Sequence, residues 1–144
     1  YLSVHNRFGT ISIRELMRMA LEEKEKQKNP EGFDSWISEL IWRDFYFQIL
    51  YHYPHVAYQS FKTKYDEFPW ENNMDFFQKW CDGKTGFPLV DAAMQQLNNT
   101  GYMHNRLRML CASFLTKHLL VDYKLGEAYF ASKLLDYDLS ANNG

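Results

Sequence analysis

Apolar residues recur every three to four positions along most of this chain, which is the spacing of amphipathic helices. No segment alternates between apolar and polar residues for long enough to indicate a strand, and no internal repeat is visible. The pattern therefore predicts an all-α fold. The expected helices cover residues 13 to about 28, 36–53, about 74–80, 88–100, 103 onward and about 127–135.

Start signals accompany the first two of these helices. Ser12 and Glu15 have the S-x-x-E spacing of a capping box. Asp34 or Ser35 is expected to cap the second helix, which Pro54 ends. A long loop rich in tyrosine and phenylalanine then leads toward the third helix.

The sequence GKTG at 83–86 is similar to part of a phosphate-binding loop, but the full motif G-x-x-x-x-G-K-[ST] is absent. The residues before it form a predicted helix instead of the strand that such a loop follows. We therefore expect 83–86 to be a turn. Pro88 fits the first turn of the next helix, and Gly101 marks the end of that helix.

Composition and charge narrow the function classes. Apolar residues are 46% and aromatic residues 17% of the 144 residues, so either the core is unusually aromatic or some rings serve stacking and partner contacts. The net charge of −2 gives no general basic field, and an anionic partner would need a local basic patch. Cys81 and Cys111 are too few for a disulfide framework, and we expect a reducing, cytoplasmic compartment. No apolar run is long enough to span a membrane.

One face of the second helix carries a carboxylate, an indole, a guanidinium and a phenol. They come from Glu39, Trp42, Arg43 and Tyr46. The opposite, aliphatic face is expected to join the core and consists of Ile37, Leu40 and Ile41. The polar face is either a solvated surface with an ion pair between its carboxylate and guanidinium, or a recognition surface for a flat, polar group.

The helix that begins near Met103 has a second unusual face, shared by Asn105, Arg108, Met109 and Ala112. A methionine in such a row is more often core filler, but beside an amide and an arginine it also suits the floor of a pocket.

The C-terminal segment places Asp136, Asp138, Asn142 and Asn143 close together. Aspartate and asparagine dominate turns, which is the plainer interpretation of this cluster. The segment lacks the further oxygen ligands of a calcium loop, so no metal site is expected.

Three long segments together resemble one known family. They are WISELIWRDFYFQI, GKTGFPLVDAAMQQLNNTGYMHNRLRMLCASFLTKHLLVDY and GEAYFASKLLDYDLSANNG. Their order and spacing are similar to the FAD-binding helical domain of the photolyase/cryptochrome family, and LSVHNRFGTIS resembles the stretch after that family's flavin-phosphate loop. The resemblance implies bound FAD, UV-damaged DNA as partner, and light-driven electron transfer from reduced flavin to a flipped-out cyclobutane pyrimidine dimer.

The resemblance also implies roles for individual residues. Lesion contact and catalysis are expected of Glu39, Trp42, Asn105, Met109 and Asn142. DNA contacts are expected of Arg43, Tyr46, Asn105 and Arg106. FAD contacts are expected of Ser3, Trp36, Arg108, Asp136, Asp138 and Asn142, with Arg108 and Asp136 as an ion pair. Electron transfer is expected of Trp70 and Tyr123.

Three positions indicate the subgroup. Photolyases that act on the (6-4) lesion have histidines where this chain has Asn105 and Met109, so the cyclobutane-dimer type fits. Asn142 stands where plant-type receptors of the family have aspartate and animal-type receptors have cysteine. The alternative is a cryptochrome-type blue-light receptor without repair activity. One departure is Tyr123, because the family's electron relay has tryptophan there.

We expect residues 1–144 to be part of the FAD-binding domain, without the N-terminal antenna α/β domain. The second chromophore, of folate or deazaflavin type, would belong to that absent domain. The isolated chain is then expected to be inactive and poor in flavin, and the parent protein to be a monomer with no membrane association.

Overall fold

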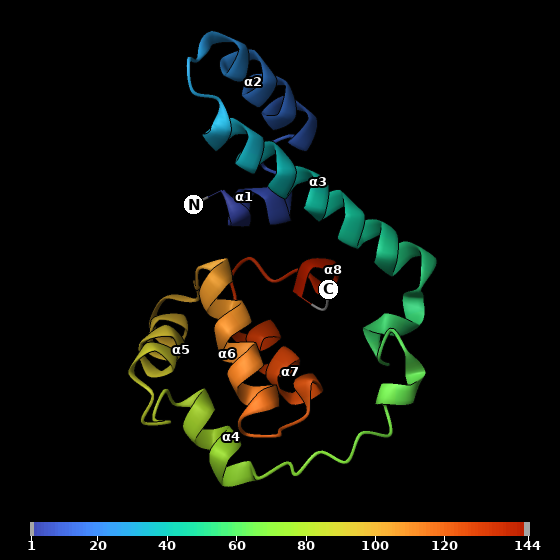
Figure 1. Cartoon of the computed structure of the whole chain (residues 1–144), viewed down its shortest axis with the longest axis vertical. Helices are drawn as coiled ribbons and strands as arrows, with labels where there is room; N and C mark the ends of the chain where they lie inside the picture. Colours follow the sequence, from blue (N-terminus) through green and yellow to red (C-terminus); the bar gives the residue numbers. More distant parts are fainter. Residues whose placement is uncertain (1, 143–144) are drawn as a thin grey trace. The chain divides into compact units, whose positions relative to one another are not determined.

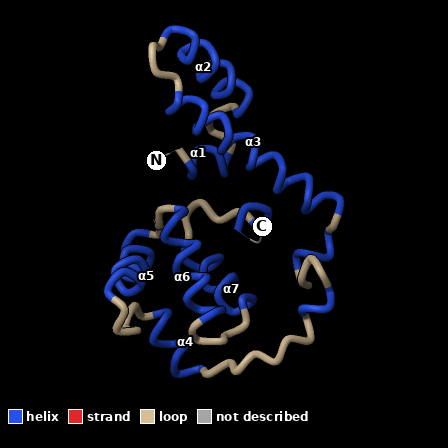
Figure 2. Tube along the Cα trace, in the orientation of Figure 1, coloured by secondary structure: helices blue, strands red, loops and turns tan. Residues whose placement is uncertain are grey.

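The computed structural model describes residues 2–142, and within that range it contains helices, turns and loops but no strand, as predicted (Figure 2). The chain divides into two compact units, one formed by residues 1–61 with 138–144 and the other by residues 62–137. Each unit is described by itself below. Among the described residues, no helix is both long and apolar enough to cross a membrane.

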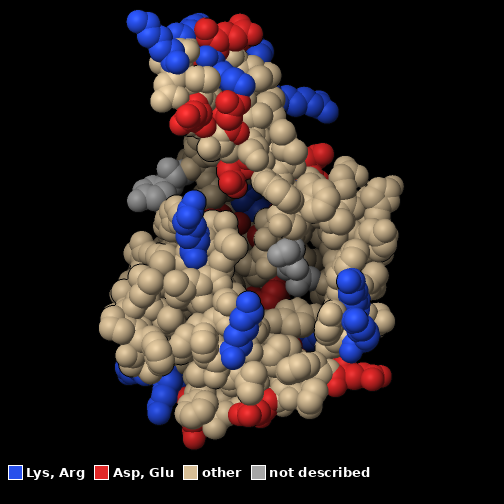
Figure 3. Space-filling view, viewed as in Figure 1, with Lys and Arg blue, Asp and Glu red and all other residues tan. Residues whose placement is uncertain are grey.

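The first unit is built around a pair of packed helices (Figure 1). Its elements are α1 (Ser3–Phe8), α2 (Ile13–Lys26), α3 (Glu31–His52), the 3-10 turn η1 (Pro54–Ala57) and α8 (Leu139–Asn142). Ala20 of α2 and Leu40 of α3 are buried. Over α2, basic and acidic side chains are interleaved in Figure 3, and Arg18 pairs with both Glu15 and Glu22. This segment is therefore the solvated, charged surface that its composition indicates.

The cap of α2 is as predicted, and that of α3 is not. Ser12 Oγ accepts a hydrogen bond from the Glu15 N–H at 3.4 Å. However, α3 begins at Glu31, so the predicted cap at Asp34 or Ser35 is wrong. Pro30 precedes the helix with a φ of −85°, close to the value that its ring imposes. Acidic residues in the first turn also suit the helix dipole, which explains the earlier start.

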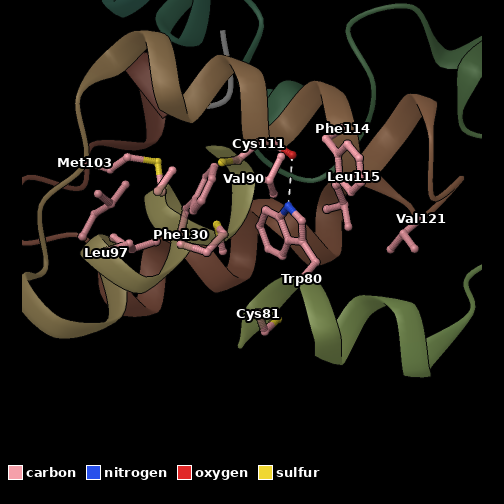
Figure 4. Packing of buried hydrophobic residues seen from close by; sticks show 13 residues of the cluster. Trp80, Cys81, Val90, Leu97, Met103, Cys111, Phe114, Leu115, Val121 and Phe130 are labelled. Carbon is pink, nitrogen blue, oxygen red and sulfur yellow. Dashed lines mark hydrogen bonds between the residues drawn. The ribbon is translucent and has the colours of Figure 1, made fainter. Parts of the chain in front are cut away.

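The second unit contains the larger core (Figure 4). Its elements are η2 (Thr63–Tyr65), α4 (Met74–Cys81), α5 (Pro88–Thr100), α6 (Asn105–Lys117) and α7 (Tyr123–Lys133). Trp80 is fully buried, and its indole Nε1–H donates to the Cys111 carbonyl at 3.0 Å, so the ring's one polar group is satisfied. Burial raises the pKa of Cys81 to about 12 and that of Cys111 to about 11, so both thiols stay protonated at neutral pH.

Glycines shape both ends of this core. α5 spans the predicted residues, and Gly101 ends it in the left-handed conformation with a φ of 67°, where an added Cβ would lie 2.7 Å from Leu135 Cγ. The start predicted for the last long helix near Glu127 is wrong, because α7 begins at Tyr123. Gly126 lies inside the helix, where it lets Leu115 approach: an added Cβ would be 2.5 Å from Leu115 Cδ2.

Residues 83–86 form the predicted turn. The Asp91 carboxylate on α5 accepts from the Thr85 N–H at 2.7 Å, the Thr85 hydroxyl at 2.6 Å and the Gly86 N–H at 2.9 Å. Burial opposes ionisation of Asp91, but the hydrogen bonds from Thr85 and Gly86 outweigh it and lower the pKa of Asp91. The loop is therefore folded onto a protein carboxylate, as a structural turn.

Candidate functional site

The N-terminus of α6 presents two of the predicted DNA-contacting residues. His104 caps the helix, and its Nδ1 accepts from the Arg106 N–H at 3.2 Å. Asn105 and Arg106 are exposed directly after this cap. One turn later, Met109 is exposed and its sulfur lies 3.9 Å from Asn105 Nδ2. Met109 is therefore a surface residue beside an amide, which excludes the core-filler interpretation.

Arg108 and Asp136 form the predicted ion pair. Arg108 Nη2 lies 2.9 Å and 2.8 Å from the two carboxylate oxygens, and Arg108 Nε donates to the Met103 carbonyl at 2.8 Å. The Asp136 side chain is only 3% exposed and that of Arg108 21%. The pair joins α6 to the segment after α7, and the full charge on the buried carboxylate is compensated by the guanidinium.

The polar face of α3 is an aromatic cluster. Trp42 is 50% exposed, and its ring centroid lies 5.5 Å from that of Phe45 and 5.9 Å from that of Tyr46. The Arg43 guanidinium lies over the Phe47 ring at 4.6 Å. These contacts hold Trp42 in place and leave half of its surface accessible for another flat group.

The alternative interpretation of this face was an ion pair between Glu39 and Arg43. Among the described residues no such pair is present, and Arg43 packs on an aromatic ring instead. Glu39 is exposed. On the opposite face Leu40 is buried and Ile37 half-buried, as predicted, but the prediction for Ile41 is wrong because this side chain is 58% exposed. Trp36, nearer the start of α3, is half-buried.

Asp138 acts as the cap of α8. Its Oδ1 accepts from the N–H of Ser140 at 3.0 Å and from the Ser140 hydroxyl, and its Oδ2 lies 3.8 Å from Arg7 Nε on α1. Asn142 lies in α8, half-buried, and its N–H donates to the Asp138 carbonyl at 2.9 Å. Asn143, the last residue of the predicted C-terminal cluster, lies outside the described residues.

Ser3, a predicted FAD-contacting residue, lies at the start of α1. Its Oγ is shielded from solvent and has no hydrogen-bond partner within residues 2–142, and the same holds for Asn6 Oδ1 one turn later. Native proteins satisfy most buried polar side-chain atoms, so two such atoms on one short helix call for a partner beyond residues 2–142.

Trp70 and Tyr123, the predicted electron-transfer residues, lie next to two hydrogen bonds that join their segments of the chain. The Asn72 N–H donates to the Leu120 carbonyl at 3.3 Å, and Asn72 Oδ1 accepts from the Asp122 N–H at 2.8 Å. Trp70 stands two residues before Asn72, and Tyr123 follows Asp122 as the first residue of α7. These hydrogen bonds hold together two segments whose bonded residues, Asn72 and Asp122, are 50 positions apart in sequence.

The predicted residues divide between the two units. The first unit holds Ser3, Trp36, Glu39, Trp42, Arg43, Tyr46, Asp138 and Asn142. The second holds Trp70, Asn105, Arg106, Arg108, Met109, Tyr123 and Asp136. In each unit some of these residues contact each other, such as Trp42 and Tyr46 in the first and Arg108 and Asp136 in the second.

Sequence reasoning missed His104 and Asn6, which belong to these groups, and Asp91, which holds the turn at 83–86. The helix was expected to begin near Met103, which placed His104 inside it, whereas α6 begins at Asn105 and His104 is its cap, a position that histidine does not favour. Asn6 is a polar residue three positions after Ser3, a spacing that matters only once α1 is known to be helical. Asp91 follows Pro88 by three residues, in the first turn of α5, which is a common place for an acidic residue.

Comparisons with known proteins agree with this architecture. Residues 36–144 match the family described as the FAD binding domain of DNA photolyase. The chain is 50% identical to the deoxyribodipyrimidine photo-lyase of Neurospora crassa, with 99% of this chain and 24% of that protein covered. The chain therefore belongs to the FAD-binding domain family of the DNA photolyases.

Solved structures extend this result. An archaeal photolyase from Sulfolobus tokodaii with two FAD molecules matches with a TM-score of 0.88 and 46% identity, over 99% of this chain and 31% of that one. A Synechocystis cryptochrome matches with a TM-score of 0.91 and 35% identity, over 99% of this chain and 29% of that one. The chain thus spans less than a third of the proteins that it matches.

Proposed function

We propose that this chain is part of the FAD-binding domain of a cyclobutane pyrimidine dimer photolyase, an enzyme that repairs UV-damaged DNA in light. The observation that carries the proposal is Trp42, a half-exposed indole fixed by aromatic neighbours, with Glu39 one turn earlier on the same helix. An enzyme acting on a flipped-out base needs a flat surface for stacking and polar groups for the base edge. The deoxyribodipyrimidine photo-lyase relative supports the same reaction class.

FAD fits the residues present. The shielded Ser3 hydroxyl lacks a partner within residues 2–142, as expected of a group that meets a cofactor phosphate. The Arg108–Asp136 pair offers a fixed charged group for the flavin ring, and Asp138 and Asn142 offer further polar groups on the segment that follows. When bound and reduced, FAD would supply the light-excited electron that splits the dimer.

The chain's own residues would bind and orient the lesion. Trp42 would stack on the dimer, and Glu39 would accept a hydrogen bond from an N–H on its base edge. Asn105 and Met109, which contact each other on α6, would contact the lesion with one polar and one apolar group. Together these contacts would offset the cost of unstacking a nucleotide, which is a few kcal/mol and lowest where the base pair is already damaged.

DNA binding would rely on local charge, since the chain carries a net charge of −2. Arg106 is exposed directly after the α6 cap and suits a phosphate contact. Arg43 and Tyr46 on α3 would add further contacts. Arg108 adds little to this patch, because its charge is paired with Asp136.

A second function is a cryptochrome-type light receptor without repair activity. The observation in its favour is the likeness to the Synechocystis cryptochrome, together with Tyr123 in place of a relay tryptophan. We further propose that an antenna α/β domain with a folate or deazaflavin chromophore precedes this domain in the parent protein, and that the parent protein is a cytoplasmic monomer.

The test compares two exposed aromatic residues of α3 in the full-length protein. Trp42→Ala should reduce the preference for dimer-containing over undamaged DNA by about tenfold, because stacking on one base is worth about 1–3 kcal/mol. Tyr51→Ala removes a ring that is 79% exposed and has no predicted role, so it should leave the preference unchanged. Equal preferences in wild type and Trp42→Ala would overturn the proposed lesion contact.

A further inference from the structure

The two partnerless atoms on α1 differ in how well they are accounted for. The proposed function gives Ser3 Oγ a phosphate partner, but it gives Asn6 Oδ1 none. A carboxamide has two donors and a two-lone-pair acceptor, so it can present either an oxygen or an NH₂ group to a ligand by rotating half a turn. Leaving the carboxamide oxygen shielded and unpaired is unfavourable, and Asn6 Oδ1 therefore requires an explanation.

The position of Asn6 is fixed by its surroundings. Ser3 and Asn6 are three residues apart on α1, which places their side chains on one face of the helix, about 5–6 Å apart between Cβ atoms. Gly9 closes α1 in the left-handed conformation, and His5 Nδ1 lies 2.8 Å from Thr10 Oγ1 beyond it. The two shielded atoms thus lie on one face of a helix whose C-terminal end is capped.

The opposite end of the same helix is tied to the C-terminal segment of the unit. Arg7 Nε lies 3.8 Å from the Asp138 carboxylate, which in turn caps α8. The helix that carries Asn6 is therefore held next to the segment that contains Asp138 and Asn142, two residues proposed to contact FAD.

We propose that Asn6 is a further FAD-binding residue, whose carboxamide forms a hydrogen bond with a hydroxyl group of the cofactor beside the phosphate that Ser3 contacts. This inference rests on the proposed function. A hydroxyl both donates and accepts, so it satisfies either orientation of the carboxamide. The sugar-like hydroxyl groups of FAD can donate to Asn6 Oδ1, whereas the ionised phosphate oxygens can only accept.

The test uses the full-length protein, stripped of flavin and then titrated with FAD while flavin fluorescence is followed. Asn6→Leu keeps the volume of the side chain and removes its hydrogen-bonding atoms. It should weaken FAD binding roughly five- to tenfold, the equivalent of one hydrogen bond. Asn99→Leu, at an exposed position of α5, is the matched control and should not change the affinity.

A second readout separates cofactor binding from a structural role. The flavin-free form of Asn6→Leu should unfold at the same temperature as the wild type or higher, because an unpaired polar atom has been removed. The rise in unfolding temperature on adding FAD should be smaller than in the wild type. A lower unfolding temperature without FAD, with an unchanged rise on adding it, would make Asn6 a packing residue and overturn the inference.

The outcomes also separate this inference from the proposed function. Equal FAD affinity in Asn6→Leu and in a wild type that does bind FAD would overturn the role of Asn6 alone. A full-length wild type that fails to bind FAD would overturn the proposed function, and the inference with it.

Discussion

The ion pair between Arg108 and Asp136 should respond unequally to the loss of either partner. The Asp136 side chain is 3% exposed and that of Arg108 21%, so water reaches the cation more easily than the carboxylate. Replacing Arg108 by Met leaves a buried carboxylate without its cation, which typically costs about 3–5 kcal/mol. It also removes the donor to the Met103 carbonyl.

The reverse change should cost less. Asp136→Asn keeps a neutral acceptor of nearly the same shape and leaves a cation that is partly hydrated, so we expect a loss of about 1–3 kcal/mol. Since a domain of this size has only about 5–15 kcal/mol of net stability, both losses are large enough to measure. The predicted order of stability is wild type, then Asp136→Asn, then Arg108→Met.

The assay is urea unfolding of the chain, followed by far-ultraviolet circular dichroism, with the midpoint and slope compared among variants. Lys26→Met is the control, because Lys26 forms an exposed pair with Glu23 at 2.7 Å and should leave the midpoint unchanged. A midpoint for Arg108→Met equal to that of Lys26→Met would refute the reasoning, since the buried carboxylate would then not need its partner. A less stable Asp136→Asn than Arg108→Met would refute the argument from exposure.

Three further predictions follow from other residues. Arg106→Ala should weaken binding of dimer-containing DNA and reduce the slope of log affinity against log salt by about 1, and an unchanged slope would exclude a phosphate contact. Because the pKa of Asp91 is lowered from the ordinary value of 3.8, the ionised carboxylate stabilises the fold fully above that value and loses this effect as the pH falls through the lowered pKa. Asp91→Asn should therefore be less stable than the wild type at neutral pH. Its urea midpoint should also fall less than that of the wild type when the pH is lowered. Tyr123→Trp should speed photoreduction of FAD in the full-length protein, because tyrosine oxidation normally requires loss of a proton as well, and equal rates would contradict a relay through this position.

Helices with clear end signals could be predicted from the sequence. Pro88 and Gly101 gave both ends of α5, because each residue restricts the backbone by itself. The start of α3 was predicted too late, because Asp34 and Ser35 are also suitable caps, whereas the helix begins directly after Pro30. The start of α7 was predicted near Glu127, but Gly126 lies inside the helix and allows close contact with Leu115, which no local pattern reveals.

The candidate site was predictable where its residues share one helix. Trp42 and Tyr46, or Asn105 and Met109, are four apart, so their contact follows from helical geometry alone. Arg108 and Asp136 are 28 residues apart, and only the family resemblance indicated their pairing. The missing partners of Ser3 and Asn6 could not be predicted at all, because burial of a side-chain atom depends on tertiary packing.

Repair itself is the decisive observation for the proposed function. The full-length protein, with its flavin reduced, would be mixed with DNA that carries a single thymine dimer, and intact thymines would be measured after blue light and after darkness. A photolyase restores the thymines in light only, and this is the result we predict. Bound flavin with an unchanged dimer after illumination would contradict it, and would favour a light receptor whose exposed Trp42 face binds a partner other than a lesion.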